Sequence, residues 1–352
     1  MFIRALASIS PQQSFGAVHL PADPVVYHSN RLSCIEPDYK EWIDPKMIRR
    51  MSRIIKMGVA TASLCLKQAG LEAPDAIVTG SAYGCLEDTG VFLNRMIEFN
   101  EEMLNPTSFI QSTHNTVGAQ VALLVKCYGY NNTFAHRGFS FESALLDGIL
   151  LLKDKEAKNV LVGAADEITN ISFGILNRFG IYRQEEISNL DLITNPANGT
   201  IAGEGSTFFL LANEPSADDF AVLNAIHTFY KPARVEDVAK EISSFLKAQS
   251  LTIHEIDLVI GGMNGDLVND GLYHQLNTTI LSGTRVLPYK HLCGEYPTSS
   301  AFALWYAATE LKTGKITDRH QPSAPGSANK KHVLIYNNYK NIHHSLFLVS
   351  SC

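Results

Sequence analysis

The stretch Ile54–Leu71 reads IIKMGVATASLCLKQAGL, and it is followed at Asp75–Ser81 by DAIVTGS. Apolar residues in the first stretch recur at helical spacing, and Gly70 stands near its end, where helices commonly stop. The second stretch holds a short apolar run, Asp75–Thr79, that leads into the turn-forming pair Gly80–Ser81. Together they predict a helix that runs into a buried strand.

The same unit returns about 180 residues later in the chain, which indicates an internal repeat. Val235–Leu251 has the spacing of the first helix, and Ile256–Ile260 has the apolar run of the first strand. This second strand also runs into a glycine turn, Gly261–Gly262. The repeat predicts two copies of one helix-to-strand motif.

Further matches extend the repeat over most of the chain. We match the predicted helices Val117–Tyr128 and Ser300–Leu311, the strands Asn159–Gly163 and His332–Tyr336, and the closing strands Thr207–Leu211 and Leu346–Val349. Fully apolar strands joined by helical crossovers suit a sheet that is covered on both faces. The sequence therefore predicts an α/β protein with duplicated halves in five layers, α/β/α/β/α.

A polar, turn-rich segment, Asn213–Asp219 (NEPSADD), separates the two predicted halves. We place the N-terminal half at residues 1–212 and the C-terminal half at residues 213–352, packed together as one compact body. Thr317–Lys331, which contains two prolines and a glycine, predicts an exposed loop.

The composition excludes several classes of protein. The chain has 352 residues, 45% of them hydrophobic and 18% charged, with a formal net charge of -6. It is too long for one small domain, too apolar for a disordered chain and too acidic for a typical nucleic-acid binder. No uncharged apolar stretch reaches the roughly 18 residues of a membrane span, and the start has no secretory pattern, so we expect a cytoplasmic protein. Six dispersed cysteines predict free thiols, with no metal and no cofactor.

Four landmarks along the chain give it a family resemblance. They are RRMSRIIKMGVATASLCLKQAGL at Arg49–Leu71, NTVGAQ at Asn115–Gln120, VLVGAADE at Val160–Glu167 and GEG at Gly203–Gly205. In this order they resemble the β-ketoacyl synthases of fatty-acid and polyketide assembly. The resemblance spans nearly the whole chain and implies the thiolase fold, with a site built from one cysteine and two histidines.

The position of the nucleophilic cysteine is changed in this chain. Gapless counting against the family, forward from Asn115 or backward from Gly163, reaches Gly138 in the sequence FAHRGFS. Glycine has no side chain that could attack a thioester, so the resemblance implies that no acyl-enzyme forms at this residue.

Both histidines of the family pattern are also missing. The first is replaced by Gly262 or by Asn264, depending on how the glycine-rich stretch is aligned. The second follows a family Lys-x-x-x-Gly motif, which is present as Lys290 to Gly294, but the next residue is Glu295. An ionised carboxylate would repel the oxyanion that a synthase must stabilise, unless the carboxyl group is protonated or paired.

This pattern resembles the chain-length factors, which are synthase-like subunits that lack the nucleophile and pair with an active synthase. The compact length is similar to that of subunits from aryl polyene and flexirubin pigment clusters. The resemblance implies an active β-ketoacyl synthase and an acyl carrier protein as partners. It places the interface at the strand Asn132–His136, together with Thr107–Asn115 beside the acyl tunnel, so the candidate contacts are Asn132, Thr133, Phe134, His136, Thr107 and Asn115.

Basic residues recur at three- and four-residue intervals in Lys46, Arg49, Arg50, Arg53 and Lys56. This spacing predicts a basic face on one helix. Such a face would attract an acidic acyl carrier protein, and we select Arg49, Arg50 and Arg53 as candidate docking residues.

Two other functions fit the same residues. A relocated active site using His136, Ser140 or Cys85 would make the chain an acyl transferase or a thioester hydrolase. A homodimeric acyl-binding protein would need no synthase partner. The sequence leaves the choice between homodimer and heterodimer open.

Overall fold

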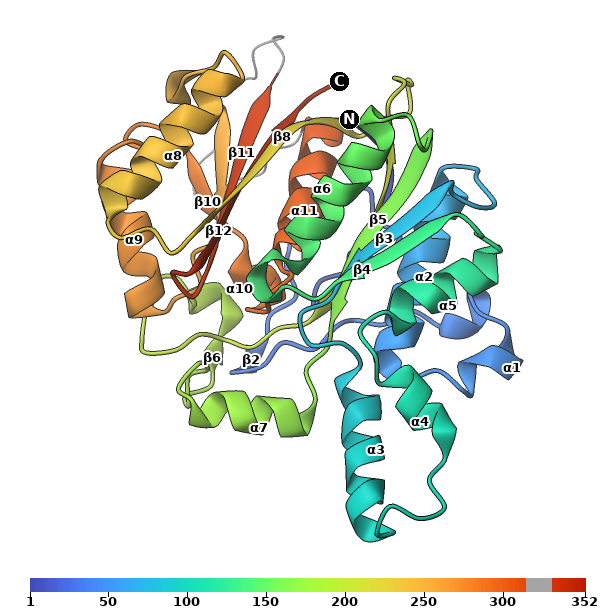
Figure 1. The fold of residues 1–352 in the computed structure, drawn as a ribbon. Helices are drawn as coiled ribbons and strands as arrows, with labels where there is room; N and C mark the ends of the chain where they lie inside the picture. Colours follow the sequence, from blue (N-terminus) through green and yellow to red (C-terminus); the bar gives the residue numbers. More distant parts are fainter. Residues whose placement is uncertain (315–330) are drawn as a thin grey trace.

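Ten strands form one hydrogen-bonded sheet in the computed structural model, which describes residues 1–314 and 331–352 (Figure 1). From one edge to the other the strands are β10 (Val286–Pro288), β9 (Leu258–Gly261), β11 (His332–Tyr339), β12 (His343–Ser350), β8 (Ala221–Tyr230), β1 (Phe2–Ile9), β7 (Gly205–Ala212), β5 (Asn159–Asp166), β3 (Ala76–Gly80) and β4 (Tyr130–Phe134).

The sheet consists of two halves with the same topology. Outward from the centre, β1-β7-β5-β3-β4 and β8-β12-β11-β9-β10 each contain two antiparallel pairings followed by two parallel pairings. The halves join where β1 pairs antiparallel with β8, through Phe2 with Val222 and Ile3 with Ala221. The predicted duplicated α/β fold is confirmed. The division that we propose after residue 212 falls between β7 and β8.

The helices complete the five layers. Figure 1 shows α6 (Ser140–Lys153) and α11 (Ser300–Thr313) between the two halves of the sheet. The outer face of the N-terminal strands is covered by α2 (Arg53–Gln68) and α5 (Thr116–Val125). The outer face of the C-terminal strands carries α8 (Val235–Ala248) and α9 (Leu267–Thr278).

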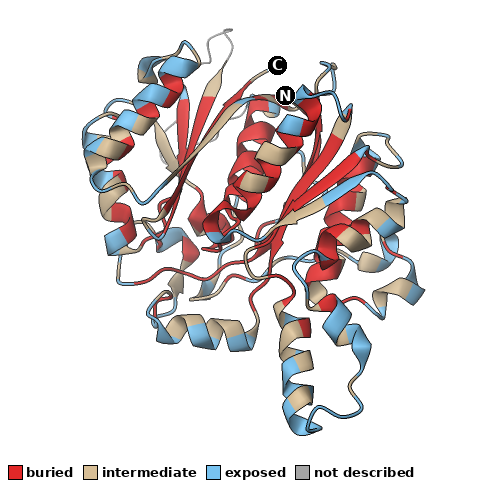
Figure 2. Ribbon diagram, viewed as in Figure 1, coloured by how far each residue is buried: buried red, intermediate tan, exposed pale blue. Residues whose placement is uncertain are grey.

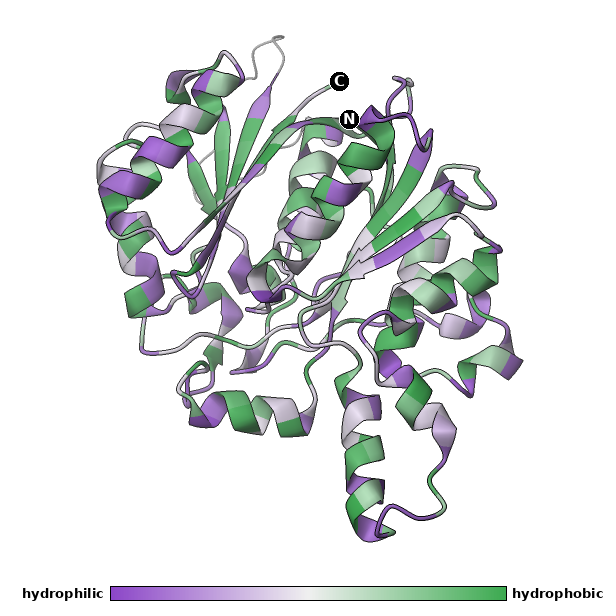
Figure 3. Cartoon of the chain, in the orientation of Figure 1, coloured by the Kyte–Doolittle hydropathy of each residue, from purple (hydrophilic) through white to green (hydrophobic). Residues whose placement is uncertain are grey.

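Hydropathy explains which helices lie inside. Every residue of α11 from Ser300 to Leu311 is buried, because a helix that is apolar nearly all round must pack on all sides (Figures 2 and 3). In α8 only one face is buried, at Val238, Ile242, Phe245 and Leu246, which have the spacing of an amphipathic surface helix.

One match of the predicted repeat is wrong. The helix predicted at Val117–Tyr128 is α5, on the outer face, whereas α11 is central and has α6 as its counterpart. Periodicity and apolar content indicate how much of a helix is buried, but they do not indicate which face of the sheet it covers.

The remaining elements are short or project from the body. They are α1 (Pro45–Ile48), α3 (Leu86–Glu98), α4 (Pro106–Gln111), α7 (Asn170–Arg178), α10 (Lys290–Cys293), the paired strands β2 (His28–Ser29) and β6 (Ile187–Ser188), and the 3-10 helices η1 (Tyr39–Glu41), η2 (Arg137–Phe139), η3 (Asn189–Asp191) and η4 (Ile253–Glu255). Figure 1 shows α3 and α4 as a hairpin that extends away from the body.

The loop predicted at Thr317–Lys331 lies outside the described residues, apart from Lys331. In the part of the chain that the structure describes, no helix has both the length and the apolarity to cross a membrane.

Candidate functional site

Gly138 lies in η2, immediately before the central helix α6, and it is buried. A Cβ placed on Gly138 would lie 2.9 Å from Cδ1 of Tyr339 and 2.9 Å from Cβ of His343. These distances are shorter than van der Waals contact, so a side chain at residue 138 would displace its neighbours. The position that the resemblance assigns to the nucleophile is therefore filled by two residues from another part of the chain.

Tyr339 and His343 belong to the hairpin that joins β11 and β12. They form the last pair of the ladder, and the turn between them contains Lys340 and Asn341 with φ of 58° and 52°. Two left-handed residues in succession are typical of tight hairpin turns, whose twist matches that of the strands. The hydroxyl groups of Tyr339 and Tyr83 lie 3.1 Å apart, which ties the hairpin tip to the loop after β3.

Lys290, Glu295 and Asn264 form a buried polar cluster next to this hairpin. Lys290 Nζ donates to Glu295 Oε2 at 2.6 Å and to the backbone oxygen of Asn338 at 3.3 Å. The amide nitrogen of Asn264 donates to the same Glu295 oxygen at 2.6 Å. Burial raises the pKa of Glu295, while the Lys290 ammonium opposes that rise by favouring the carboxylate. Glu295 is therefore paired with a cation.

The two alternatives for the first histidine lie in different surroundings. A Cβ on Gly262 would lie 2.7 Å from both Asn337 Oδ1 and the Tyr273 hydroxyl, so a side chain there would have to displace them. Asn264 is held in the cluster because its backbone N–H donates to Asp270 at 2.9 Å. The structure thus brings Asn264 together with Glu295 and Lys290, whereas Gly262 packs against Asn337 and Tyr273.

Sequence reasoning missed two buried carboxyl groups near this centre. Glu142 of α6 accepts a hydrogen bond from Ser345 at 2.9 Å. Burial raises its pKa to about 7, while Ser300 and Ser345 oppose the rise. Asp166 ends β5 and accepts hydrogen bonds from Thr298 and Ser81, while burial raises its pKa to about 6. The available signal is an acidic residue inside an apolar run, as in FESALL and VGAADE.

The residues considered for a relocated active site do not form a nucleophile–base pair. Ser140 Oγ accepts from the backbone N–H of His136 at 2.9 Å and donates to the backbone oxygen of Arg137 at 2.8 Å. Cys85 is fully buried, and burial raises the pKa of its thiol. Within the described residues, the ring of His136 makes no hydrogen bond to either of them. No group of three potential metal-binding side chains occurs among these residues either.

The predicted interface strand, Asn132–His136, overlaps β4, which ends at Phe134. Among the described strands, β4 lies at the edge of the sheet and pairs with β3 alone. The backbone N–H of Thr133 donates to the side chain of Asn132 at 2.9 Å, which leaves it outside the ladder with β3. Phe134 is half-buried, whereas His136, Thr107 and Asn115 are exposed. An exposed strand edge of this kind is available for pairing with another chain.

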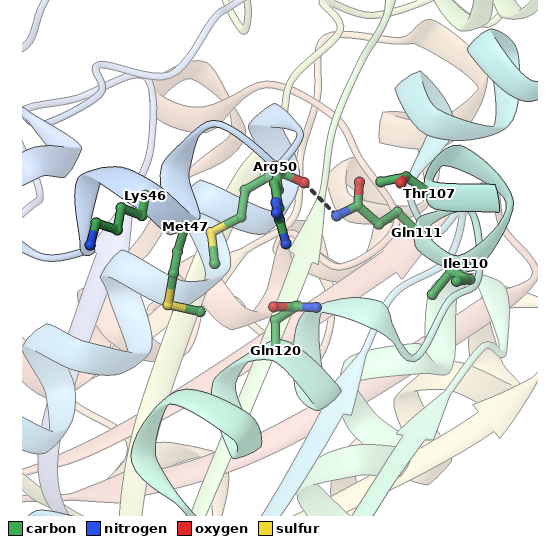
Figure 4. A pocket seen from close by; sticks show the side chains of 8 residues that line it. Lys46, Met47, Arg50, Thr107, Ile110, Gln111 and Gln120 are labelled. Atoms are coloured by element: carbon green, nitrogen blue, oxygen red, sulfur yellow. Dashed lines mark hydrogen bonds between the residues drawn. The ribbon is translucent and has the colours of Figure 1, made fainter. Parts of the chain in front are cut away.

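A cavity of about 460 Å³ lies between α1, α4 and α5, and Figure 4 shows its lining side chains. It is lined by Lys46, Met47, Arg50, Met51, Thr107, Ile110, Gln111 and Gln120. Gln111 Nε2 donates to the backbone oxygen of Arg50 at 2.5 Å, which links α4 to the α1 turn. Arg50, a candidate docking residue, and Thr107, a candidate interface residue, therefore line the same cavity.

The predicted basic face on one helix is wrong. Lys46 lies in α1, Arg49 and Arg50 lie in the exposed turn after it, and Arg53 and Lys56 lie in α2. The guanidinium group of Arg53 donates twice to buried Glu204, at 2.6 Å each, and once to Glu36 at 2.5 Å. Arg53 is therefore occupied by internal carboxylates, and Arg49 and Arg50 remain as candidate docking residues.

The duplicated sheet with two central helices defines a thiolase-like fold of the β-ketoacyl synthase type. In agreement, residues 31–176 match the family described as β-ketoacyl synthase, N-terminal domain. The predicted resemblance to that family is confirmed. No curated protein sequence matches the chain.

Three solved structures share the fold over the whole chain. The ishigamide ketosynthase/chain length factor has a TM-score of 0.77 at 15% identity, covering 100% of this chain and 98% of that one. A β-ketoacyl synthase from Burkholderia phymatum STM815 has 0.76 at 16% identity, covering 100% and 99%. AntDE:AntF, a type II PKS acyl-carrier protein in complex with its ketosynthase bound to the hexaketide, has 0.75 at 12% identity, covering 100% and 99%.

Proposed function

We propose that this chain is a non-catalytic, synthase-like subunit of the chain-length-factor type, which pairs with an active β-ketoacyl synthase. The observation that carries the proposal is the filled nucleophile position, where Tyr339 and His343 stand against Gly138. Loss of a nucleophile typically lowers turnover by roughly a millionfold, and a side chain at residue 138 would also have no room. Condensation at this position is therefore not expected from the chain alone.

The charges of the buried cluster support the same conclusion. A synthase stabilises a developing oxyanion with neutral hydrogen-bond donors, whereas this chain holds a carboxyl group, Glu295, joined to Lys290. An unpaired carboxylate about 4 Å from an oxyanion would oppose it by roughly 4 kcal/mol at an effective dielectric constant of 20. The ion pair with Lys290 stabilises the buried carboxyl group instead. We therefore give the cluster a structural role and no catalytic one.

The proposed partner is an active synthase that adds its own edge strand to β4. The free edge of β4 and the exposed residues Thr107 and Asn115 support this surface. In such a pair, Phe134 and the segment Thr107–Asn115 would bound the tunnel in which the partner's acyl chain grows. The chain would then act through geometry. Its compact length supports a place beside the synthase-like subunits of aryl polyene and flexirubin pigment clusters.

The carrier protein is proposed to dock near the cavity between α1, α4 and α5. Arg49 and Arg50 are exposed there, and Lys46 lines the same cavity. An acidic carrier would be steered to these cations by opposite charge.

Co-expression with an active β-ketoacyl synthase, sought first among the genes next to this one, tests the proposal. We expect a one-to-one complex and, by intact-mass measurement after incubation with an acyl carrier thioester, an acyl adduct on the synthase only. A stoichiometric adduct on this chain would point to a relocated active site. A stable homodimer that does not bind the synthase would favour the alternative function, a homodimeric acyl-binding protein.

A further inference from the structure

A second cavity, of about 620 Å³, lies between α3, α7 and the segment 31–36. It is separate from the polar cluster, since neither Gly138 nor Glu295 lines it. Leu86 and Val91 of α3 and Ile171 of α7 contribute apolar walls. Its volume is within the range of small-molecule sites, which combine apolar walls with a few polar groups.

Both cations that line this cavity make hydrogen bonds within the chain, although Nε of Arg31 has no hydrogen-bond partner among the described residues. Arg53 is neutralised by Glu204 and Glu36, as described above. Arg31 donates from its two terminal nitrogens to neutral oxygens, the Asn170 side chain and the Ile168 backbone, at 2.8 Å each. Neither guanidinium group forms an ion pair with Glu167, whose carboxyl group also lines the cavity.

Within the described residues, Glu167 forms no direct ion pair, although the positive charge of Arg53 favours its ionised form. It is 4% exposed and lines the cavity, and its Oε1 accepts the backbone N–H of Glu87 at 3.0 Å. Its other carboxyl oxygen makes no hydrogen bond within the described residues. Burial is the main cause that raises the pKa of Glu167 to about 7, and the charge of Glu87 adds to the rise, while the backbone N–H of Glu87 and the charge of Arg53 oppose it. A cation placed in the cavity beside Glu167 would favour its ionised form.

We propose that this cavity binds a primary ammonium group carried on an apolar body. The ammonium group contacts Glu167 and Glu87, and the body packs between α3 and α7 against Val91 and Ile171. An ammonium group fits because it supplies several donors and a close positive charge to a buried carboxyl group that has one hydrogen-bond donor and no direct ion pair. The site does not depend on the proposed partnership with a synthase.

Gly90 of α3 offers a way to close the cavity. It lines the cavity, and a Cβ placed on it would meet only Ile171 Cδ1, at 3.7 Å, which is ordinary contact. A phenylalanine at residue 90 would therefore project into the cavity, whereas an alanine would leave most of it open. Gly90→Ala is the matched control for Gly90→Phe.

Titration calorimetry of the full chain with 4-phenylbutylamine tests the proposal, with 4-phenylbutyrate as the acid of matching shape. We expect the amine to bind at least tenfold more tightly than the acid. Glu167→Gln should weaken amine binding by about tenfold or more, since the acceptor keeps its hydrogen bond but loses the negative charge that strengthens it. Gly90→Phe should abolish binding, and Gly90→Ala should retain it.

A second ligand, Nα-acetyl-lysine amide, mimics a lysine side chain of a protein. It tests whether the ammonium group belongs to a small amine or to a protein. We expect it to bind more weakly than 4-phenylbutylamine, because its body covers less of the apolar walls. Tighter binding of the lysine amide, equal binding of the phenyl acid, or amine binding unchanged by Glu167→Gln would each overturn the proposal. Thermal unfolding of each variant shows whether a lost signal reflects misfolding.

Discussion

The ring of Tyr339 lies where a side chain on Gly138 would project, with Cδ1 only 2.9 Å from the position of a Cβ. The two residues come from opposite halves of the chain, at the start of α6 and at the tip of the β11–β12 hairpin. The absence of a side chain at residue 138 and the position of the hairpin are thus parts of one packing arrangement. A thiol introduced at residue 138 would oppose that packing.

Gly138→Cys tests this arrangement. We expect the variant to be destabilised by about 1–3 kcal/mol, because the new side chain overpacks against Tyr339 and His343. It should also remain free of acyl adduct by intact-mass measurement. Gly174→Ala is the control, since a Cβ on Gly174 meets nothing within 4 Å. A Gly138→Cys chain that is acylated and as stable as the parent would contradict the packing argument.

Glu142 predicts a pH-dependent contribution to stability. Its pKa in the folded chain, about 7, exceeds the ordinary value of 4.5, so the folded state binds more protons than the unfolded state between these pH values. Stability from this group is therefore present below about pH 4.5 and falls as the pH rises through 7. Relative to Glu142→Gln, the parent should lose on the order of 2 kcal/mol of unfolding free energy across this range.

Urea unfolding at pH 5, 6, 7 and 8 measures this difference. Gln at residue 142 can still accept the hydrogen bond from Ser345, so packing is conserved while the charge is lost. Glu236→Gln, at an exposed position of α8, controls for the removal of one carboxylate. A parent-to-variant difference that stays flat with pH would mean that burial does not raise the pKa of Glu142.

The sequence predicts the strands β3, β5, β7 and β9 because buried strands are continuous apolar runs. It does not predict the contact of Tyr339 with Gly138, because that contact depends on how the two halves pack and not on local pattern. From the sequence, an unpaired Glu295 would repel an oxyanion. In the structure Lys290 donates a hydrogen bond to Glu295, so its carboxyl group is paired. Likewise, charge spacing suggested Arg53 as a docking residue, whereas buried Glu204 holds its guanidinium group.

Thr133→Pro tests the partner edge of β4. The Thr133 N–H donates to the Asn132 side chain and not to β3, so proline removes a donor from the free edge while leaving the β3 ladder intact. Both Thr133→Pro and the control Thr133→Val lose the hydroxyl contact with Thr79. We expect only the proline variant to lose the synthase in co-purification. Equal retention by the two variants would place the interface elsewhere.

Charge reversal separates docking cations from structural ones. Arg49→Glu with Arg50→Glu changes two exposed residues, so we expect unchanged thermal stability and roughly tenfold weaker carrier association at low salt. Arg53→Met should instead lower the unfolding free energy by on the order of 3 kcal/mol, because buried Glu204 loses its cation. Fluorescence anisotropy of a labelled carrier at several salt concentrations measures the first effect, and urea unfolding the second. Carrier affinity that the double reversal leaves unaltered would remove Arg49 and Arg50 from the docking surface.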